Sequence, residues 1–522
     1  MAHHAFGTSR LQRLIGWFAL VASVAMTGCA ALPTGIQRAA SHTVVDARTT
    51  LAQTAAAALP GADATLSGAR LIADGDHALA ARIALIRRAE RSIDLQTYQL
   101  ASDGTGARVL RELRDAAARG VRVRLLIDDL YAAGQDELFG ALAADAHIEV
   151  RLFNPLPVRN ASFAPRIAMS LHEFSRINRR MHNKLFIADG ALAIAGGRNV
   201  ADEYYLRSEA ANFVDMDVLL AGAAVRELGT VFDAYWNSEH AYPIGAFTGQ
   251  AQTREFDALS AMAATEIAWP QRDRAGRDSI PAQLERGALT LSPARVQVLA
   301  DDPAKATGAA TRTTRAAAAE AFAAAQSQLT IVSPYFVPGA SGMEMLQTMQ
   351  TRGVRVSVTT NSLGATDEPL VHAGYAKYRL AMLRMGVKLH EMGGAMSRKA
   401  GWLGDLRSSS GRLHAKLAVI DQQRLFIGSM NMDGRSERFN TELGLLIDSR
   451  ALATEVAGLF EAGSQRATYQ LRLTPNDDGR ERIEWVSTDD DGEFAHIDEP
   501  DRGGLTALKL SLLSALISED LL

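Results

Sequence analysis

The chain has 522 residues, which is too long for one ordinary hydrophobic core, so two or three domains are expected. A composition of 47% hydrophobic and 22% charged residues is typical of a globular protein and excludes a disordered or fibrous one. The net charge of −4 lacks the basic excess of proteins that bind duplex nucleic acid, so no nucleic-acid partner is expected.

Residues 1–28 resemble a bacterial lipoprotein signal peptide. Arg10 and Arg13 precede an apolar run over 14–26, which leads through small residues to Cys29, the only cysteine. The alternative is a transmembrane anchor, but the run is shorter than the roughly 20 residues that span a bilayer. We therefore expect lipidation of Cys29 in the bacterial cell envelope. The alanine after Cys29 favours the outer membrane, facing the periplasm.

The Ala-rich segment 29–71 contains few large apolar residues, which is typical of a flexible tether. Beyond it, a strand (92–100), a helix (106–120) and a strand (121–129) are predicted from hydrophobic periodicity. The same order returns at 328–337, 343–353 and 354–362, and "RGVRV" stands at the helix–strand junction both times. The repeat predicts two homologous α/β halves, over 72–240 and 296–466.

Two further segments flank the second half. Residues 241–295 are polar and contain Pro243, Pro270 and Pro281, which predicts an irregular insert. Residues 467–522 comprise an acidic segment and an apolar tail over 505–522. The tail could lie on a membrane or dock as a terminal helix, and the sequence leaves both readings open.

A polar motif occurs once in each half with the same spacing. The first copy comprises His182, Lys184, Asp189, Gly196, Gly197 and Asn199, and the second comprises His414, Lys416, Asp421, Gly428, Ser429 and Asn431. Only seven of the 55 Lys and Arg residues are Lys, so two such motifs by chance are implausible.

Each motif begins in an apolar, strand-like run, "HNKLFIA" or "HAKLAVI". Side chains alternate along a strand, so the His and Lys of each motif should share one face. Asp189 and Asp421 have the opposite parity, and Asp189-Gly190 is typical of a hairpin turn, which favours a structural role for both aspartates. The small residues that follow should let the backbone approach closely and bring each Asn to the same face.

Two such faces would form a joint site with two His, two Lys and two Asn. The set contains no Cys and no dense carboxylate cluster, so neither a metal nor another cofactor is expected. Two cations with two amide donors suit an anionic phosphodiester, and two histidines can supply a nucleophile and a general acid.

The doubled motif resembles the phospholipase D superfamily. The strings "HEFSRINRRMHNK", "GGRNVADEYY" and "RSERFNTELGLLID" resemble its bacterial cardiolipin synthase C-type branch, over most of residues 75–470. This resemblance implies two halves, each a mixed β-sheet flanked by helices, with one active site at a pseudo-twofold interface. It also implies a covalent phosphohistidine intermediate.

The resemblance further implies a role for each motif residue. His182 would be the nucleophile and His414 the general acid, although the near-symmetry of the motifs leaves their order open. Glu442 would orient His182 and Asp215 would orient His414, with Asp217 as the rival of Asp215. The Lys and Asn side chains would hold the phosphoryl oxygens.

Several other polar residues carry weaker signals. His172, Arg176, Arg179 and Arg180 precede the first motif, and a solvated basic face is favoured over a second phosphate site. Tyr98 and Tyr335 end corresponding strands and could pack or contact substrate. Arg435 and Ser436 could line the site or brace the strand after it. His372 and His390 are interpreted as structural.

The favoured function is phosphatidyl transfer that makes cardiolipin, with phosphatidylglycerol as acceptor and phosphatidylglycerol or phosphatidylethanolamine as donor. The alternative is hydrolysis of phospholipids to phosphatidic acid, because both reactions share one intermediate. A nuclease of the same superfamily is disfavoured by the charge and the expected tether. The expected partners are phospholipids and a membrane, with no obligate protein partner.

Overall fold

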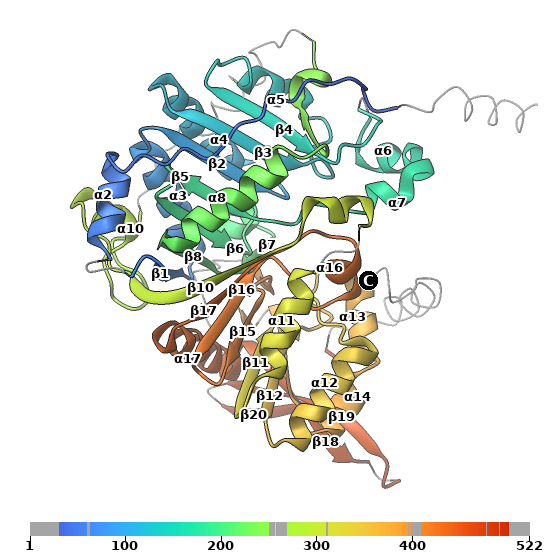
Figure 1. Ribbon diagram of the computed structural model, residues 1–522. Helices are drawn as coiled ribbons and strands as arrows, with labels where there is room; N and C mark the ends of the chain where they lie inside the picture. Colours follow the sequence, from blue (N-terminus) through green and yellow to red (C-terminus); the bar gives the residue numbers. More distant parts are fainter. Residues whose placement is uncertain are drawn as a thin grey trace, which may run out of the picture.

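The computed structural model describes residues 31–59, 63–159, 161–249, 256, 261, 269–309, 312–394, 396–397, 409–476, 478–489 and 491–500. The predicted signal peptide, Cys29 and the apolar tail over 505–522 lie outside the described residues. Figure 1 shows two α/β halves, the first coloured blue to green and the second yellow to red.

The first half is built on one mixed sheet with the strand order β9-β4-β3-β2-β5-β6-β8-β1. Strands β2, β3 and β4 are parallel, and the other neighbours are antiparallel. The strands are β1 (Ser67–Ile72), β2 (Ser92–Thr97), β3 (Arg122–Asp128), β4 (Ile148–Phe153), β5 (Leu185–Ala188), β6 (Leu192–Gly196), β7 (Ala211–Val214, outside this sheet), β8 (Asp217–Gly222) and β9 (Ala241–Pro243). The helices are α2 (Thr50–Ala57), α3 (Gly75–Arg88), α4 (Gly104–Ala118), α5 (Asp136–Leu142), α6 (Phe163–Met169), η1 (Leu171–Glu173), α7 (Phe174–Ile177), η2 (Asp202–Tyr205), α8 (Ala223–Trp236) and η3 (Ile244–Ala246).

The second half repeats this order as β20-β19-β18-β13-β12-β11-β15-β16-β17-β10, with two extra strands at one edge. Its strands are β10 (Ser292–Ala300), β11 (Gln328–Val332), β12 (Arg355–Asn361), β13 (Lys388–Met392), β14 (Ser410–Leu413, outside this sheet), β15 (Leu417–Ile420), β16 (Arg424–Gly428), β17 (Leu443–Asp448), β18 (Thr468–Pro475), β19 (Glu481–Asp489) and β20 (Gly492–His496). Its helices are η4 (Pro303–Thr307), α11 (Thr314–Ala323), α12 (Gly339–Thr351), α13 (Pro369–Ala376), α14 (Arg379–Arg384), α16 (Gly434–Arg438) and α17 (Arg450–Ala467). Helix α10 (Ile280–Glu285) lies in the insert and packs on α3 of the first half. The predicted α/β repeat is confirmed, strand by strand.

The strands form where the sequence has short runs rich in Val, Ile and Leu. The central strands β2, β5 and β6 are buried along their whole length, as expected for a sheet with both faces covered. Helix α4 begins where the Asp103 carboxylate accepts a hydrogen bond from the Gly106 N–H, the usual chemistry of a helix N-cap.

The two halves join through one strand pair and one shared core. Strands β1 and β10 pair antiparallel at the edges of the two sheets. Beneath them, one apolar cluster contains Phe232 and Trp236 from α8 together with Val456 and Phe460 from α17. Burial of large side chains from both halves makes this interface resemble a domain core.

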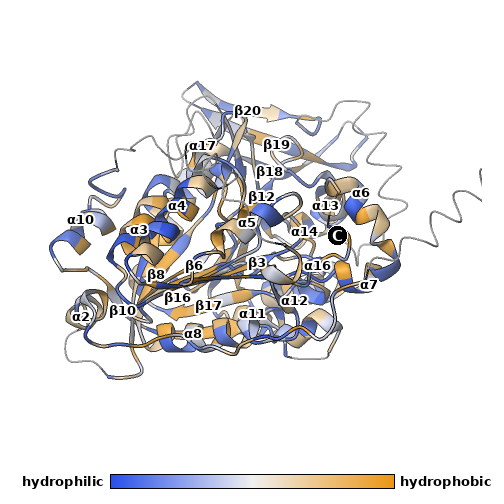
Figure 2. Ribbon diagram, turned by 90° about the horizontal axis from the view of Figure 1, so that it is seen from above, coloured by the Kyte–Doolittle hydropathy of each residue, from blue (hydrophilic) through white to orange (hydrophobic). Residues whose placement is uncertain are grey.

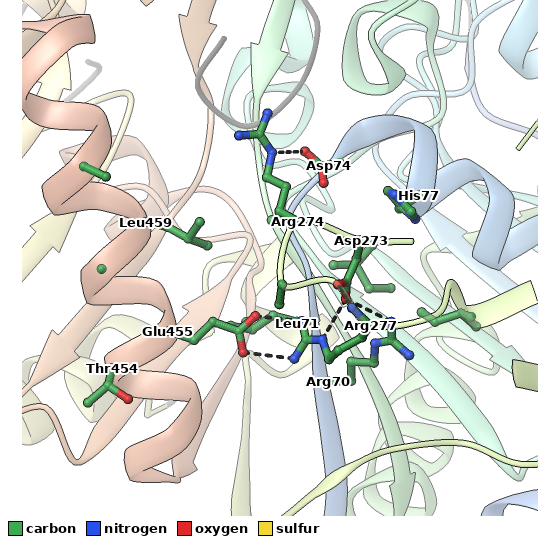
Figure 3. Close-up of a pocket in the computed structure, with 16 residues that line it drawn as sticks. Arg70, Leu71, Asp74, His77, Asp273, Arg274, Arg277, Thr454, Glu455 and Leu459 are labelled. Carbon is green, nitrogen blue, oxygen red and sulfur yellow. Dashed lines mark hydrogen bonds and ion pairs between the residues drawn. The ribbon is translucent and has the colours of Figure 1, made fainter. Parts of the chain in front are cut away.

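A polar network reinforces the junction (Figure 3). Arg277, from the insert, donates to Glu455 of α17 at 2.7 Å and to Asp273 at 2.7 Å. Arg70 of β1 also donates to Asp273 at 3.0 Å. The insert therefore ties β1 of the first half to α17 of the second beside a cavity of about 320 Å³.

The segment predicted as a flexible tether packs against the first half where the structure describes it. Thr43 donates to Asp94 of β2 at 3.0 Å, Arg124 donates to the Ser41 carbonyl at 2.9 Å, and Leu51 of α2 is buried. The contacts are made largely through backbone groups and small side chains, and amino-acid composition does not report such contacts. In the acidic segment, β19 and β20 pair with β18 and extend the second sheet.

Candidate active site

The polar motifs meet because each half lends a short extended segment to the other. Strand β7 of the first half pairs parallel with β14 of the second, from Ala211–Ser410 to Val214–Leu413. On the other side, Met181 forms a parallel bridge with Thr441. These two exchanges place the residue after each segment, His414 or His182, against a carboxylate of the opposite half.

The exchange also shortens the two motif strands, which the sequence predicted to include the His and Lys of each motif. Strands β5 and β15 begin at Leu185 and Leu417, so the His and Lys of each motif precede the strand. The backbone there is hydrogen-bonded across the halves, because the His182 N–H donates to the Thr441 carbonyl and the His414 N–H donates to the Val214 carbonyl. A partner from a distant part of the chain therefore replaces the expected sheet neighbour.

His182 is held by Glu442 of the opposite half. The imidazole Nδ1 lies 3.0 Å from Glu442 Oε2 and 3.1 Å from Oε1. The carboxylate also accepts hydrogen bonds from the hydroxyls of Ser429 and Ser436, so its orientation is fixed. Since Nδ1 faces the carboxylate, the other ring nitrogen, Nε2, remains for chemistry.

His414 is held by Asp215 in the same way. Its Nδ1 lies 2.6 Å from Asp215 Oδ2, and Lys416 Nζ lies 3.0 Å from the same nitrogen. The shorter contact with an ionised carboxylate requires the proton on Nδ1. Both pairs are almost completely buried, and both join residues from different halves.

Asp217, the rival of Asp215, forms no ion pair or hydrogen bond with a histidine among the residues that the structure describes. It forms ion pairs with Arg82 at 3.0 Å and Arg198 at 3.3 Å, so it neutralises two buried arginines. Residues two apart on a strand share one face, but β8 begins only at Asp217, so Asp215 precedes the strand and its carboxylate reaches His414.

The pKa shifts follow from burial of these pairs. Burial lowers the pKa of His182 to about 4 against the opposing effect of Glu442, and burial with Lys416 lowers that of His414 to about 4. For Asp215, the neighbouring His414 and Lys416 outweigh burial and lower the pKa to about 2. The resting site at neutral pH therefore pairs neutral imidazoles with ionised carboxylates.

The two lysines lie beside the histidines. Lys184 Nζ donates to the His182 carbonyl at 2.6 Å, and Lys416 Nζ donates to the His414 carbonyl. Burial lowers the pKa of Lys416 to about 8 and that of Lys184 as well. A bound anion would offset this desolvation, so the buried ammonium groups favour a negatively charged ligand.

The two asparagines differ in their partners. Asn199 donates to the Tyr204 hydroxyl at 2.8 Å. The Oδ1 of Asn431 is buried without a hydrogen-bond partner among the described residues, and its backbone N–H donates to Ser436. Both side chains line the same cavity as the histidines.

The motif aspartates hold turns. The Asp189 carboxylate accepts hydrogen bonds from the backbone N–H groups of Glu90, Arg91 and Ser92, at the start of β2. Asp421 does the same for Gln326, Ser327 and Gln328 at the start of β11. Both residues have positive φ, as does the residue after each, which matches the primed turns of tight hairpins.

The small residues of the motifs permit close approach. A Cβ at position 197 would overlap the Asp215 carboxylate, and one at 428 would overlap the Leu443 carbonyl. A glycine at each position lets the next strand lie against the site, as the sequence predicts.

Aromatic rings hold the imidazoles from the side. Tyr98 meets His182 edge-on with ring centroids 5.0 Å apart, and Tyr204 meets His414 in the same way at 5.0 Å. Phe213 lies 4.8 Å from His414. The sequence indicated Tyr98 as a candidate but missed Tyr204 and Phe213. These two aromatic residues lie between the first motif and Asp215, and no sequence pattern marks them.

Asp301 is another residue that the sequence missed. It accepts a hydrogen bond from the Glu442 N–H at 3.0 Å and from Lys305 Nζ at 2.7 Å. It lies 141 positions from Glu442, and no local pattern marks it.

A cavity of about 750 Å³ contains both histidines and is lined by both halves. Arg435 of the second half contacts the first half, where it donates to the Asn178 side chain at 2.9 Å. At the rim, Tyr335 donates to Asp367 at 2.8 Å, and burial with the nearby Asp367 raises the pKa of Glu368.

The basic cluster before the first motif divides into different roles. Arg180 is fully buried and pairs with Asp128 at 3.1 Å, so it is not part of a solvated face. Arg176 pairs with Glu173, and Arg179 donates to the carbonyls of Lys305 and Arg438. His172 is exposed. The expected solvated face is therefore wrong for Arg180, whose buried partner is distant in sequence.

His372 and His390 lie outside the histidine pair. His372 contacts Glu499 at 2.8 Å and Arg379, and His390 of β13 lies near Thr468. No group of three or more His, Cys, Asp or Glu side chains within the described residues has a metal-binding arrangement. Among the same residues, no helix has the length and apolar character to cross a membrane.

Comparison with known proteins identifies the family to which the two halves belong. A family model described as "Cardiolipin synthase, PLD-like domain" matches residues 83–236 and 319–463, one segment per half. Cardiolipin synthase C of Escherichia coli (strain K12) is 37% identical over 416 residues, covering 78% of this chain and 86% of that protein. Cardiolipin synthase A of Pseudomonas fluorescens is 28% identical over 401 residues, covering 76% and 68%.

A solved structure shares the fold. The crystal structure of phosphatidylserine synthase from Haemophilus influenzae Rd KW20 matches with a TM-score of 0.57 at 15% identity, covering 86% of this chain and 92% of that one. The doubled motif, the paired sheets and the two family segments agree, and the chain therefore belongs to the phospholipase D superfamily of enzymes, within its cardiolipin synthase-like PLD domain family.

Proposed function

We propose that this enzyme transfers a phosphatidyl group onto the hydroxyl of phosphatidylglycerol and so makes cardiolipin, with phosphatidylglycerol or phosphatidylethanolamine as donor. The observation that carries the proposal is the pair of His–carboxylate contacts, each made across the two halves and opening on one cavity. The similarity to a protein named cardiolipin synthase C supports the choice of product.

In the first step, neutral His182 attacks the phosphorus of the donor through Nε2. A nitrogen–phosphorus bond forms, and the bond from phosphorus to the donor's head-group oxygen breaks. That oxygen takes the Nε2 proton of His414, which is an imidazolium in the substrate complex because the bound phosphodiester anion and Asp215 both raise its pKa. Glu442 stabilises the charge that develops on His182 as the bond forms.

In the second step, His414 takes the proton from the acceptor hydroxyl, whose oxygen attacks the phosphorus. The nitrogen–phosphorus bond breaks and His182 returns to its neutral form. Lys184, Lys416, Asn199 and Asn431 hold the phosphoryl oxygens in both transition states, where the negative charge is concentrated.

We further propose that Cys29 is lipidated and tethers the enzyme to the cell envelope on its periplasmic side. The support is the charged start, short apolar run and small residues before Cys29. A tethered enzyme would meet both lipid substrates in the same bilayer.

The test is incubation with vesicles of phosphatidylglycerol and phosphatidylethanolamine, followed by mass spectrometry of the lipids. The expected product is cardiolipin with little phosphatidic acid, and donor choice is read by isotopic labelling of either lipid. Mostly phosphatidic acid would assign hydrolysis instead, because water would then be the acceptor. His182→Ala, which removes the attacking nitrogen, is the matched inactive control.

A further inference from the structure

An exposed apolar surface lies beside the site, on the segment that contains α6, η1 and α7. Phe163 is 45% exposed, Met169 53%, Leu171 52% and Phe174 48%. These four residues are called the α6–α7 surface below. Both views place α6 and α7 at the periphery of the molecule, and Figure 2 colours part of each helix as hydrophobic. Soluble proteins rarely gather large apolar side chains on one exposed segment unless that segment binds something.

The orientation of α6 is the reverse of that of an ordinary surface helix. Its fully buried residue is Arg166, which donates to the Val158 carbonyl at 2.9 Å and the Asp129 carbonyl at 3.1 Å and pairs with the Asp129 carboxylate. A surface helix normally buries its apolar face and exposes its charges. Here the buried ion pair points inward and holds the apolar side chains toward the outside.

The rest of the segment is fixed in the same manner. Arg176 of α7 donates to the Pro155 carbonyl at 2.9 Å, and Asn154 donates to the carbonyls of Arg176 and Arg179. The exposure of the α6–α7 surface is therefore imposed by polar contacts beneath it.

A line of aromatic rings connects this surface to the site. Phe163 stacks on Tyr131 with ring centroids 5.8 Å apart, Tyr131 meets Tyr98 at 5.3 Å, and Tyr98 meets His182 at 5.0 Å. Tyr131 and Phe174 also line the cavity that contains both histidines. The apolar surface thus continues into the active-site cavity through a line of aromatic rings.

We propose that the α6–α7 surface inserts into the phospholipid bilayer and brings the mouth of the cavity to the lipid. The inference rests on the proposed function, because a substrate that resides in a bilayer must pass from it into the cavity. Residues 161–172 contain no Asp or Glu, and Glu173 is neutralised by Arg176, so no free carboxylate of this segment repels an anionic lipid surface.

The first test places a polarity-sensitive dye on the surface. Cys29 is the only cysteine, so the full chain with Cys29→Ser and Met169→Cys has one thiol to label. Vesicles of phosphatidylglycerol and phosphatidylethanolamine should shift the dye emission to the blue. The matched control is Val45→Cys in the same background; Val45 is 67% exposed and precedes α2, which lies away from α6 in both views. Its emission should not shift.

Two results would overturn the proposal. Emission from position 169 that stays unshifted by vesicles would show that the surface does not enter lipid. Emission that is already blue without vesicles and rises with protein concentration would assign the surface to a second copy of the chain.

The second test separates docking from chemistry. Met169→Ser with Leu171→Ser should lower kcat/KM at least 5-fold on vesicles and leave it unchanged on short-chain phospholipid below its micelle concentration. Val45→Ser should change neither value. An equal loss on both substrates would contradict the docking role. A wild-type chain that turns over neither substrate would contradict the proposed function, while the dye at position 169 would still report docking.

Discussion

At the scale of single residues, the site depends on two carboxylates that lie far in sequence from the histidines they hold. Glu442 is 260 positions from His182, and Asp215 is 199 positions from His414. Each carboxylate is buried and ionised, so it fixes the proton on Nδ1, and in the proposed mechanism it stabilises the imidazolium that forms.

Replacing Glu442 with Gln tests the first of these contacts. The rate at pH 7 should fall by about 10²- to 10⁴-fold, because the imidazole loses its orienting charge. The Glu442 charge raises the pKa of His182, so its removal lowers that pKa further below about 4. The acid limb of the pH–rate profile should then move to lower pH; a shift to higher pH would contradict this account.

The order of the two histidines can be decided by trapping the intermediate. His414→Asn keeps the nucleophile but removes the base of the second step, so a chain that carries the phosphatidyl group on His182 should accumulate from labelled donor. The phosphatidyl adduct on the protein is measured by intact-mass spectrometry after a quench at alkaline pH. If a phosphorylated chain accumulates only in His182→Asn, the roles are reversed.

At the scale of elements, the hairpins β5–β6 and β15–β16 carry the motif aspartates as anchors. Each carboxylate accepts three backbone N–H groups at the start of a neighbouring strand, β2 or β11. This arrangement satisfies donors that would otherwise be lost at the end of a strand.

Asp189→Asn should therefore destabilise the protein by about 1–3 kcal/mol and leave the turnover of the folded enzyme near normal. Thermal unfolding measures the first quantity and the vesicle assay the second. A folded but inactive Asp189→Asn enzyme would assign this residue to the chemistry instead.

Asp421 offers a test by pH. Burial would raise its pKa, but the backbone hydrogen bonds from Gln328, Gln326 and Ser327 outweigh burial and lower the pKa to about 2. Because the folded-state pKa lies below the unfolded value, the stabilisation is present above about pH 4 and is lost as the pH falls toward 2. The difference in Tm between wild type and Asp421→Asn should shrink over that window, whereas a constant difference would exclude this origin.

At the scale of the whole molecule, the site exists only while the two halves keep their relative position. The shared core, the β1–β10 pair and the insert hold them together. Arg277 contacts Asp273 and Glu455, and none of the three residues lines the catalytic cavity.

Arg277→Ala should lower the free energy of unfolding by about 1 kcal/mol, because a partly buried network is lost, and Tm should fall by about 1 °C. Turnover at 25 °C should be unchanged. Arg272→Ala is the matched control, since its side chain is 73% exposed and 3.7 Å from Asp278, and it should alter stability by less than about 0.5 kcal/mol. Equal losses in both variants would exclude a specific role for the network.

The sequence by itself determined the repeated α/β halves, the polar motifs and the hairpin turns. These features are local: strands follow hydrophobic runs, turns follow Asp-Gly, and equal spacing marks the two copies. The sequence also indicated Glu442 and Asp215, but only through the resemblance to the phospholipase D superfamily and not through a local pattern.

Only the tertiary structure decided which groups touch. The exchange of extended segments across the halves placed His182 and Lys184 ahead of β5, selected Asp215 over Asp217 at His414, and brought in Tyr204 and Asp301. The same is true of the packing of residues 38–57, the burial of Arg180 and the outward face of α6. Each depends on a partner far away along the chain, and a contact of that kind leaves no periodicity in the sequence around it.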